Sequence, residues 1–156
     1  MSFERATPVD DRAAFRHRVT APVRFGDLDA MGHLNNLALL GLLETGRVEY
    51  VVDLGLGTHS DLTYVLASLR VDFRSQAFFR DELVCGSRAT RCGRTSMVLA
   101  QHVWRPADDT VVAEAESVIV ALGPDAATPI VLPDAWRRRI RAWEPEPVEE
   151  GTGGSR

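Results

Sequence analysis

Ten residues decide the fold and the chemistry expected of this chain: Asp27-Leu28-Asp29-Ala30-Met31-Gly32-His33-Leu34-Asn35-Asn36. They join an expected strand over residues 18–25 to an apolar segment of helical length over residues 37–54. The first N–H groups of a helix have no partner within the helix and carry partial positive charge. An anion, or an oxygen that becomes one during a reaction, is therefore stabilised there. Carboxylates beside such a helix start have the composition of an acyl-transfer site.

The segments that follow this stretch predict one long helix and then a run of strands. Residues 37–54 place apolar side chains at three- and four-residue steps and end before Gly55, as a buried helix does. Beyond a loop the apolar period changes to two, which predicts strands over 68–73, 82–92, 96–104 and 111–122. The short connections between the last three predict antiparallel pairing. Pro133 then opens a short helix that is expected to end near Ala142.

These elements predict an α+β architecture, in which an antiparallel β-sheet of about five strands wraps around one long central helix. The expected domain spans residues 17–142, with a loose lead-in over 1–16 and a disordered tail rich in Glu, Pro and Gly over 143–156. One helix covers only one face of such a sheet, so apolar surface remains to be covered. We therefore expect a homodimer or homotetramer.

Composition limits the classes of function. A chain of 156 residues with 45% hydrophobic content fits one domain with one core. The net charge is -4 and the only basic run is Arg137-Arg138-Arg139, which argues against a nucleic-acid partner. All 18 basic residues are arginine, so chemistry that needs a lysine amine is excluded.

The cysteines and the hydropathy predict a soluble cytoplasmic protein. Cys85 and Cys92 are expected to lie in one strand, roughly 23 Å apart at the usual rise, which is too far for a disulfide. A reducing compartment is consistent with this usage. No apolar run reaches the ~18 residues of a membrane span, and residues 1–11 contain no signal-peptide core.

Several ordered blocks resemble the hotdog-fold acyl-CoA thioesterases of the 4-hydroxybenzoyl-CoA thioesterase type. The similarity covers about residues 17–141 and is carried by Val23–Asn36, Glu44–Tyr50, Arg70–Phe73, Asp81–Leu83, Arg91–Ser96, Val112–Glu116 and Leu132-Pro133. The resemblance implies paired chains with active sites at their interface and an acyl-CoA substrate hydrolysed without a metal or other cofactor. Asp29 matches the family's catalytic carboxylate, and the backbone N–H near Asn36 matches the group that polarises the thioester carbonyl. Arg80 departs from the pattern, because relatives often carry glycine there.

The two aspartates of the stretch have different expected roles. By spacing alone, Asp27 and Asp29 each fit a turn or cap that binds nearby backbone N–H groups. The resemblance assigns catalysis to Asp29 and leaves a structural role to Asp27. A carboxylate suits thioester hydrolysis either as a general base toward water or as a nucleophile that forms an anhydride. The sequence does not separate these two routes.

The neighbouring residues are candidates for the rest of the site. His33 either orients water and the carboxylate or is a hydrogen-bonding histidine at the start of the helix. Asn35 is a good N-cap, which would hold the carbonyl-binding N–H in place, and Gly32 permits close approach of the thioester. Arg91 and Arg94 either bind the phosphates of coenzyme A or are solvated strand arginines.

Metal binding and serine chemistry are not expected. Asp27-x-Asp29-x-Met31-Gly32 resembles part of a calcium loop, but Ala38 stands where the loop needs a bidentate glutamate. The four histidines, His17, His33, His59 and His102, have no zinc-ligand spacing. No Gly-x-Ser-x-Gly nucleophile elbow is present.

Two other functions compete with the thioesterase. One is a hotdog enoyl-CoA hydratase or dehydratase. That family pairs Asp and His within a Gly-Asp-x-Asn-Pro-x-His type of sequence, but here Gly26-Asp27 is followed by neither the asparagine nor the proline. A non-catalytic acyl-CoA binding subunit would keep the fold, and the intact Asp29 argues against it. The acyl group, the choice between coenzyme A and acyl carrier protein, and dimer versus tetramer stay open.

Overall fold

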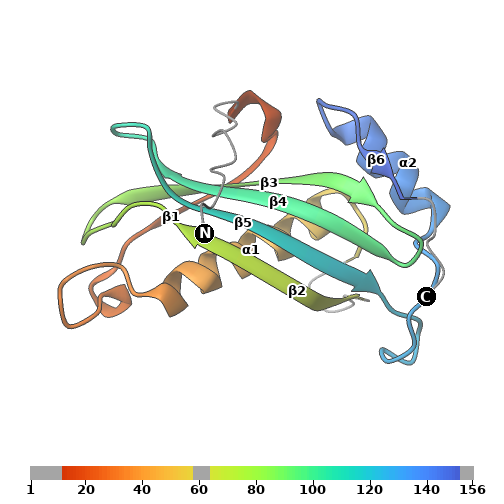
Figure 1. Ribbon diagram of the computed structural model, residues 1–156, viewed down its shortest axis with the longest axis horizontal. Coiled ribbons are helices and arrows are strands. Elements are labelled where there is room, and N and C mark those ends of the chain that lie inside the picture. The colour runs from red at the N-terminus through yellow and green to blue at the C-terminus, as the bar shows by residue number, and fades with distance from the viewer. Residues whose placement is uncertain (1–11, 58–63, 152–156) are drawn as a thin grey trace, which may run out of the picture.

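One antiparallel sheet and one long helix form the body of the molecule, as the sequence predicts (Figure 1). The computed structural model describes residues 12–57 and 64–151. The strands are β1 His17–Pro22, β2 Tyr64–Phe73, β3 Glu82–Cys92, β4 Ser96–Arg105, β5 Thr110–Ala121 and the short β6 Glu149–Glu150; the helices are α1 Asn36–Asp53 and α2 Asp134–Trp143. The strand order is β1-β3-β4-β5-β2, and β6 pairs in parallel with β3.

The strand and helix bounds differ from the prediction mainly at two places. β2 begins at Tyr64 rather than at residue 68, because a register shift between Leu66 and Ser68 breaks the period of two on which the prediction relied. The first strand ends at Pro22 rather than at residue 25, and Phe25–Asp27 form a turn of 3₁₀ helix instead. The ends of the other elements agree to within one residue.

The core lies between α1 and one face of the sheet. The first half of α1 buries Leu39 and Leu43 against β3, β4 and β5, and its second half buries Tyr50 and Val51. Gly46 lies at a close approach of helix and sheet, because a Cβ there would stand 2.8 Å from the sulfur of Cys85. The apolar stripe of α1 thus fixes the helix on the sheet along its whole length.

A buried polar network ties α1 to the middle of the sheet. Arg47 is only 4% exposed, and its Nη1 donates to Gln101 Oε1 at 3.3 Å and to Ser117 Oγ at 3.5 Å. Gln101 Nε2 donates to the carbonyl of Leu43 at 2.9 Å and to Ser87 Oγ at 3.0 Å. Since buried polar groups are costly when unpaired, this network specifies how α1 sits on the strands.

The prediction of a disordered tail is wrong for residues 143–151. Glu144 is buried, and its Oε1 accepts hydrogen bonds from the Tyr50 hydroxyl and from the backbone N–H of Ala89 at 2.8 Å. Along β3, the pairing with β1 reaches Ser87 and the pairing with β6 begins at Arg91. Glu144 therefore accepts a backbone hydrogen bond from the edge of β3 between these two pairings. The polar composition predicted disorder here. The Glu144 side chain instead accepts the hydrogen bond from Ala89 that a neighbouring strand would otherwise accept.

Residues 12–16, the described part of the expected lead-in, are also more ordered than the sequence predicted. Ala14 and Phe15 are both 2% exposed, and Phe15 packs on Gly86, where a Cβ would lie 2.7 Å from that side chain. Residues 1–11 and 152–156 lie outside the described residues. No helix in the described ranges is long and apolar enough to cross a membrane.

The buried carboxyl of Glu144 makes the stability depend on pH. Burial raises the pKa of this carboxyl, and within the described part of the chain its Oε2 has no hydrogen-bond partner. The folded protein therefore holds this proton more tightly than the unfolded chain does. The stability contributed by Glu144 is fully present below the unfolded carboxyl pKa of about 4.3 and is lost as the pH rises through the raised value.

We predict that Glu144→Gln gains stability relative to the wild type as the pH rises. The amide keeps an acceptor for Tyr50 and Ala89 and carries no charge at any pH. Urea unfolding at pH 5 and pH 8 measures the unfolding free energy of both proteins. From pH 5 to pH 8, the unfolding free energy of the variant should rise relative to that of the wild type by on the order of 1 kcal/mol. Glu116→Gln, an exposed carboxylate on β5, is the control. A difference that is the same at both pH values for Glu144→Gln would contradict this origin of the pH dependence.

Candidate active site

Asp27 links the two ends of the segment between β1 and α1 through hydrogen bonds to Arg24 and Asn35. Its Oδ2 accepts from the backbone N–H of Arg24 at 2.9 Å and from Arg24 Nε at 3.1 Å, and its Oδ1 accepts from Arg24 Nη2 at 2.9 Å. These hydrogen bonds lower the pKa of the Asp27 carboxyl. The Asp27 carbonyl accepts both the backbone N–H and the side-chain amide of Asn35, at 2.8 and 2.9 Å. Asp27 therefore braces the segment, and both oxygens of its carboxylate are engaged by Arg24.

Asp29 lies in the centre of the same segment with its carboxylate exposed. Its Oδ1 accepts from the backbone N–H groups of Met31 at 2.8 Å and His33 at 3.1 Å. Among the residues that the structure describes, both hydrogen bonds fall on Oδ1 and none on Oδ2. The hydrogen bond from His33 is the main reason that the pKa of Asp29 is lowered. The carboxylate is thus ionised near neutral pH, and its Oδ1 is held by two backbone N–H groups.

The turn that holds Asp29 requires a glycine. Gly32 has φ +81°, a left-handed conformation that other residues rarely adopt, and its N–H donates to the Asp29 carbonyl at 3.1 Å. The Asp29 N–H in turn donates to the carbonyl of His33 at 2.8 Å. Gly32 therefore shapes the carboxylate's turn, whereas the sequence predicted that it lets a substrate approach.

The start of α1 is capped beside this turn. Asn35 has extended backbone angles, φ -72° and ψ 152°, and its Oδ1 accepts from the N–H of Ala38 at 2.7 Å. Asn36 is the first helical residue, so its own N–H has no partner within the helix. The cap uses the Asn35 side chain and leaves the Asn36 N–H as a donor at a fixed position.

A cavity of about 380 Å³ brings the three predicted catalytic residues together. Asp29, His33 and Asn36 line one side of it. The other side comes from the end of β2, the connector after it and β5, through Phe73, Arg74, Ser75, Gln76, Ala77 and Val112. The sequence missed this role because the connector carries no motif, and it predicted Phe73 and Val112 only as residues of strands.

The connector between β2 and β3 anchors the segment that carries Asp29. The Leu34 N–H donates to the carbonyl of Ala77 at 2.8 Å, and His33 pairs with Phe78 through an isolated bridge. The rings of His33 and Phe78 meet edge to face, with centroids 5.4 Å apart. These contacts hold the carboxylate's turn against the sheet.

Arg91 and Arg94 lie away from this cavity. Arg91 is near the end of β3 and Arg94 is in the following turn, whereas the segment with Asp29 lies at the opposite end of the sheet (Figure 1). Glu82 and Arg91 alone are separated by about 30 Å at the usual strand rise. The structure therefore does not bring these two arginines to Asp29 within one chain.

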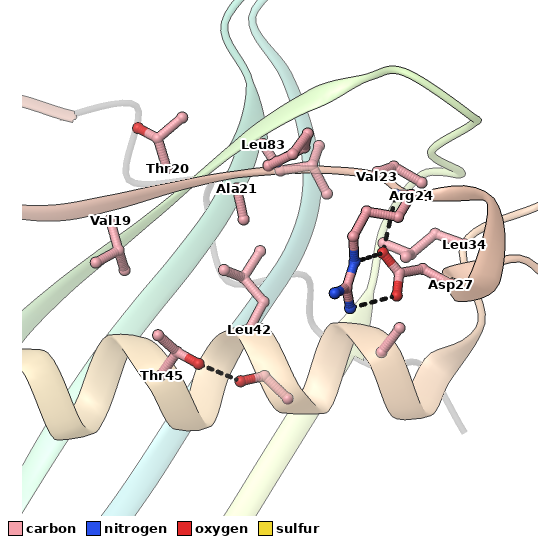
Figure 2. A pocket seen from close by; sticks show the side chains of 13 residues that line it. Val19, Thr20, Ala21, Val23, Arg24, Asp27, Leu34, Leu42, Thr45 and Leu83 are labelled. Atoms are coloured by element: carbon pink, nitrogen blue, oxygen red, sulfur yellow. Dashed lines mark hydrogen bonds and ion pairs between the residues drawn. The ribbon is translucent and has the colours of Figure 1, made fainter.

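A second cavity, of about 500 Å³, lies between β1 and α1 (Figure 2). β1 and α1 enclose it with mostly apolar side chains, among them Val19, Ala21 and Leu42, and the ion pair between Arg24 and Asp27 stands at one end. Leu34 lines both cavities. The segment that carries Asp29 thus contributes to both cavities.

Comparison with known proteins assigns the family. The family model of the Thioesterase-like superfamily matches residues 23–140. The chain belongs to the thioesterase-like superfamily. A thioesterase from Thermus thermophilus, solved with coenzyme A and Zn, shares 32% identity at a TM-score of 0.74, over 86% of this chain and 98% of that one. A search of the curated proteins finds no match.

Two further solved structures share the hotdog fold. A predicted thioesterase from Bacillus stearothermophilus is 23% identical at a TM-score of 0.73, over 83% of this chain and 98% of that one. A 1,4-dihydroxy-2-naphthoyl-CoA thioesterase from Synechocystis is 16% identical at a TM-score of 0.72, over 81% and 96%. The predicted fold and family are confirmed, and the superfamily supports thioesterase activity in general.

Proposed function

We propose that this thioesterase-like protein hydrolyses an acyl-CoA thioester to the free acid and coenzyme A at the cavity of Asp29. The observation that carries the proposal is the ionised carboxylate of Asp29 in one cavity with Asn36, the residue whose N–H begins α1. The coenzyme A in the Thermus thermophilus thioesterase supports the choice of carrier.

The helix start would polarise the thioester. The Asn36 N–H donates to the carbonyl oxygen and gains strength as that oxygen becomes an anion, and the partial positive charge of the α1 start acts in the same direction. The donor needs no rearrangement during the reaction, because the Asn35 cap already fixes it. This interaction favours the tetrahedral intermediate over the bound substrate.

Two routes use the same carboxylate. As a general base, Asp29 takes a proton from water while the water oxygen attacks the carbonyl carbon, and collapse of the intermediate expels the thiolate, which takes up the proton. As a nucleophile, an Asp29 oxygen attacks the carbonyl carbon, the thiolate leaves, and water hydrolyses the resulting anhydride. His33 holds the carboxylate through its backbone N–H, and its side chain, at a residue that lines the cavity, would orient the water.

The chemistry in these routes needs no metal or other cofactor. The described residues contain no group of three or more His, Cys, Asp or Glu side chains that could hold a metal ion. The zinc named for the Thermus thermophilus structure is therefore not carried over to this chain.

A second subunit would complete the site. Among the described strands, β2 lies at an edge of the sheet with β5 as its only neighbour, and it exposes Val65 and Leu66. If two copies paired antiparallel through their β2 edges, the sheet of the second copy would run in the opposite direction to that of the first. The end with Arg91 and Arg94 would then lie at the same end as Asp29 of the first copy, where these arginines could meet the phosphates of coenzyme A.

We predict that Asp29→Asn abolishes hydrolysis and leaves the fold intact. Asparagine keeps an oxygen for the N–H groups of Met31 and His33 but is neither a base nor a nucleophile. Free-thiol release should fall by ~10²–10⁴. Asp125→Asn is a matched control, because Asp125 also accepts two backbone N–H groups, of Ala127 at 3.0 Å and Thr128 at 2.9 Å. Near-normal turnover in Asp29→Asn would move catalysis to another group, with Glu44 and Glu49 the next to test.

Two substitutions of Asn36 separate its N–H from its side chain. Asn36→Ala keeps the N–H and should keep part of the activity. Asn36→Pro removes the donor, and Pro is tolerated at a first helical position that follows an extended residue, as Asn35 is. Its turnover should fall by ~10²–10³. Melting temperatures check that both variants fold, and equal activity in the two would place the carbonyl oxygen elsewhere.

We predict a dimer or higher oligomer at micromolar concentration. Sedimentation velocity measures the mass, and Leu66→Arg, which puts a charge on the β2 edge, should shift it toward the monomer. Ile130→Arg is the control, since Ile130 is 37% exposed and Leu66 38%, but Ile130 lies outside β2. A wild-type monomer would remove the interfacial part of the proposal.

A further inference from the structure

An exposed cluster of aromatic and arginine side chains lies at the same end of the sheet as Asp29. Phe25 is 77% exposed and Phe79 is 47% exposed, and their rings meet edge to face with centroids 6.0 Å apart. The guanidinium carbon of Arg80 lies 5.1 Å from the centre of the Phe79 ring. Large aromatic side chains are usually buried, so a paired and exposed set beside a cation indicates a binding surface.

The backbone at Arg80 is strained. Its φ is +70°, in the left-handed region that glycine adopts freely and other residues rarely do. The Arg80 N–H donates to the Val23 carbonyl at 3.0 Å, which holds the connector against the end of β1. Glycine would satisfy this conformation better than arginine, so the local fold gives no reason for a long cationic side chain here.

Arg80 is also a cation without a carboxylate partner among the described residues. The adjacent Asp81 points elsewhere, because its Oδ2 accepts from the N–H of Phe78 at 2.9 Å and from Arg105 Nη1 at 2.7 Å. The nearby Arg24 is engaged by Asp27. In a chain of net charge -4, Arg80 is thus a local positive charge available to an anion.

The connector that carries Arg80 also forms part of the cavity. Ala77 lines the cavity, and the bridge between His33 and Phe78 brings the connector alongside the segment that carries Asp29. Arg80 is three residues beyond Ala77, so at most about 10 Å of chain separates them. Figure 1 shows this connector, between β2 and β3, at the same end of the sheet as the segment between β1 and α1. A flexible pantetheine arm can join a thioester in the cavity to a phosphate at Arg80.

We propose that Arg80, with Phe79 and Phe25, binds the nucleotide end of coenzyme A in the same chain whose Asp29 faces the thioester. The guanidinium donates two N–H groups to a phosphate, and the exposed rings offer a face to the adenine base. This inference rests on the proposed function and names the part of the substrate that the cluster takes. It assigns a phosphate contact to the same chain, where Arg91 and Arg94 can supply one only from a second copy.

The test compares Arg80→Gly, Arg80→Lys and the wild type on one acyl group carried by two thiols. The probes are the coenzyme A thioester and the N-acetylcysteamine thioester, which has no phosphate and no adenine. Arg80→Gly should raise KM for the coenzyme A ester about 10-fold and leave kcat unchanged. Its kcat/KM for the N-acetylcysteamine ester should equal that of the wild type. Arg80→Lys should recover part of the loss, and the melting temperature of Arg80→Gly should not fall. Arg138→Ala, an exposed arginine on α2, controls for net charge.

Three results would overturn the inference. Arg80→Gly could leave KM for the coenzyme A ester unchanged, or it could lower activity equally on both esters. It could also weaken only hydrolysis of an acyl carrier protein ester, in which case the cluster docks a protein. If the wild type hydrolyses neither ester, the proposed function fails by itself. Calorimetry with free coenzyme A then decides this inference: weaker binding by Arg80→Gly supports it, and equal or absent binding contradicts it.

Discussion

Burial of the apolar face of α1 against the sheet is the constraint on which the rest of the structure depends. Leu43, Tyr50 and Val51 are fully buried there, and the Arg47 network adds a polar contact that sets the position of the helix on the strands. With the helix fixed, its first residue is fixed as well. The start of α1 then lies at the end of the sheet where β1 ends and β2 leads to β3 (Figure 1).

The segment between β1 and α1 uses most of its polar groups to hold itself in place. The Asp27 carboxylate accepts hydrogen bonds from Arg24. The side chain of Asn35 donates to the Asp27 carbonyl and accepts from the N–H of Ala38. The proposed chemistry uses two of the groups that remain, which are the second carboxylate oxygen of Asp29 and the N–H of Asn36. Both residues line one cavity. The advantage of this arrangement is physical, because a carboxylate held by backbone N–H groups is ionised and rigid at once.

The sequence predicted the fold well because the fold depends on local signals, and the structure places the predicted residues Asp29, His33 and Asn36 around one cavity. The long apolar stripe of α1, the period of two in β3, β4 and β5, and the motif around Asp29 are each contiguous in the chain. The predictions failed where contacts join distant segments. Glu144 pairs with Tyr50 and Ala89 across the fold, and no composition signal reports that.

Three further features that the sequence did not reveal also depend on contacts between distant segments. The bulge in β2 removed the alternation that marks a strand. Arg91 and Arg94 carry a suitable charge, but their place at the far end of β3 follows only from the register of the sheet. The connector residues that face Asp29 have no motif of their own. Cytoplasmic location, independence from cofactors and the oligomeric state stay predictions.

The measurement that tests the proposed hydrolysis most directly is the release of free thiol from a panel of short, long and aromatic acyl-CoA thioesters. We expect at least one ester to release one coenzyme A for each acid formed, over many turnovers. Binding of the panel without any release of thiol would contradict the proposal, because the chain would then be an acyl-CoA binder with an unused carboxylate.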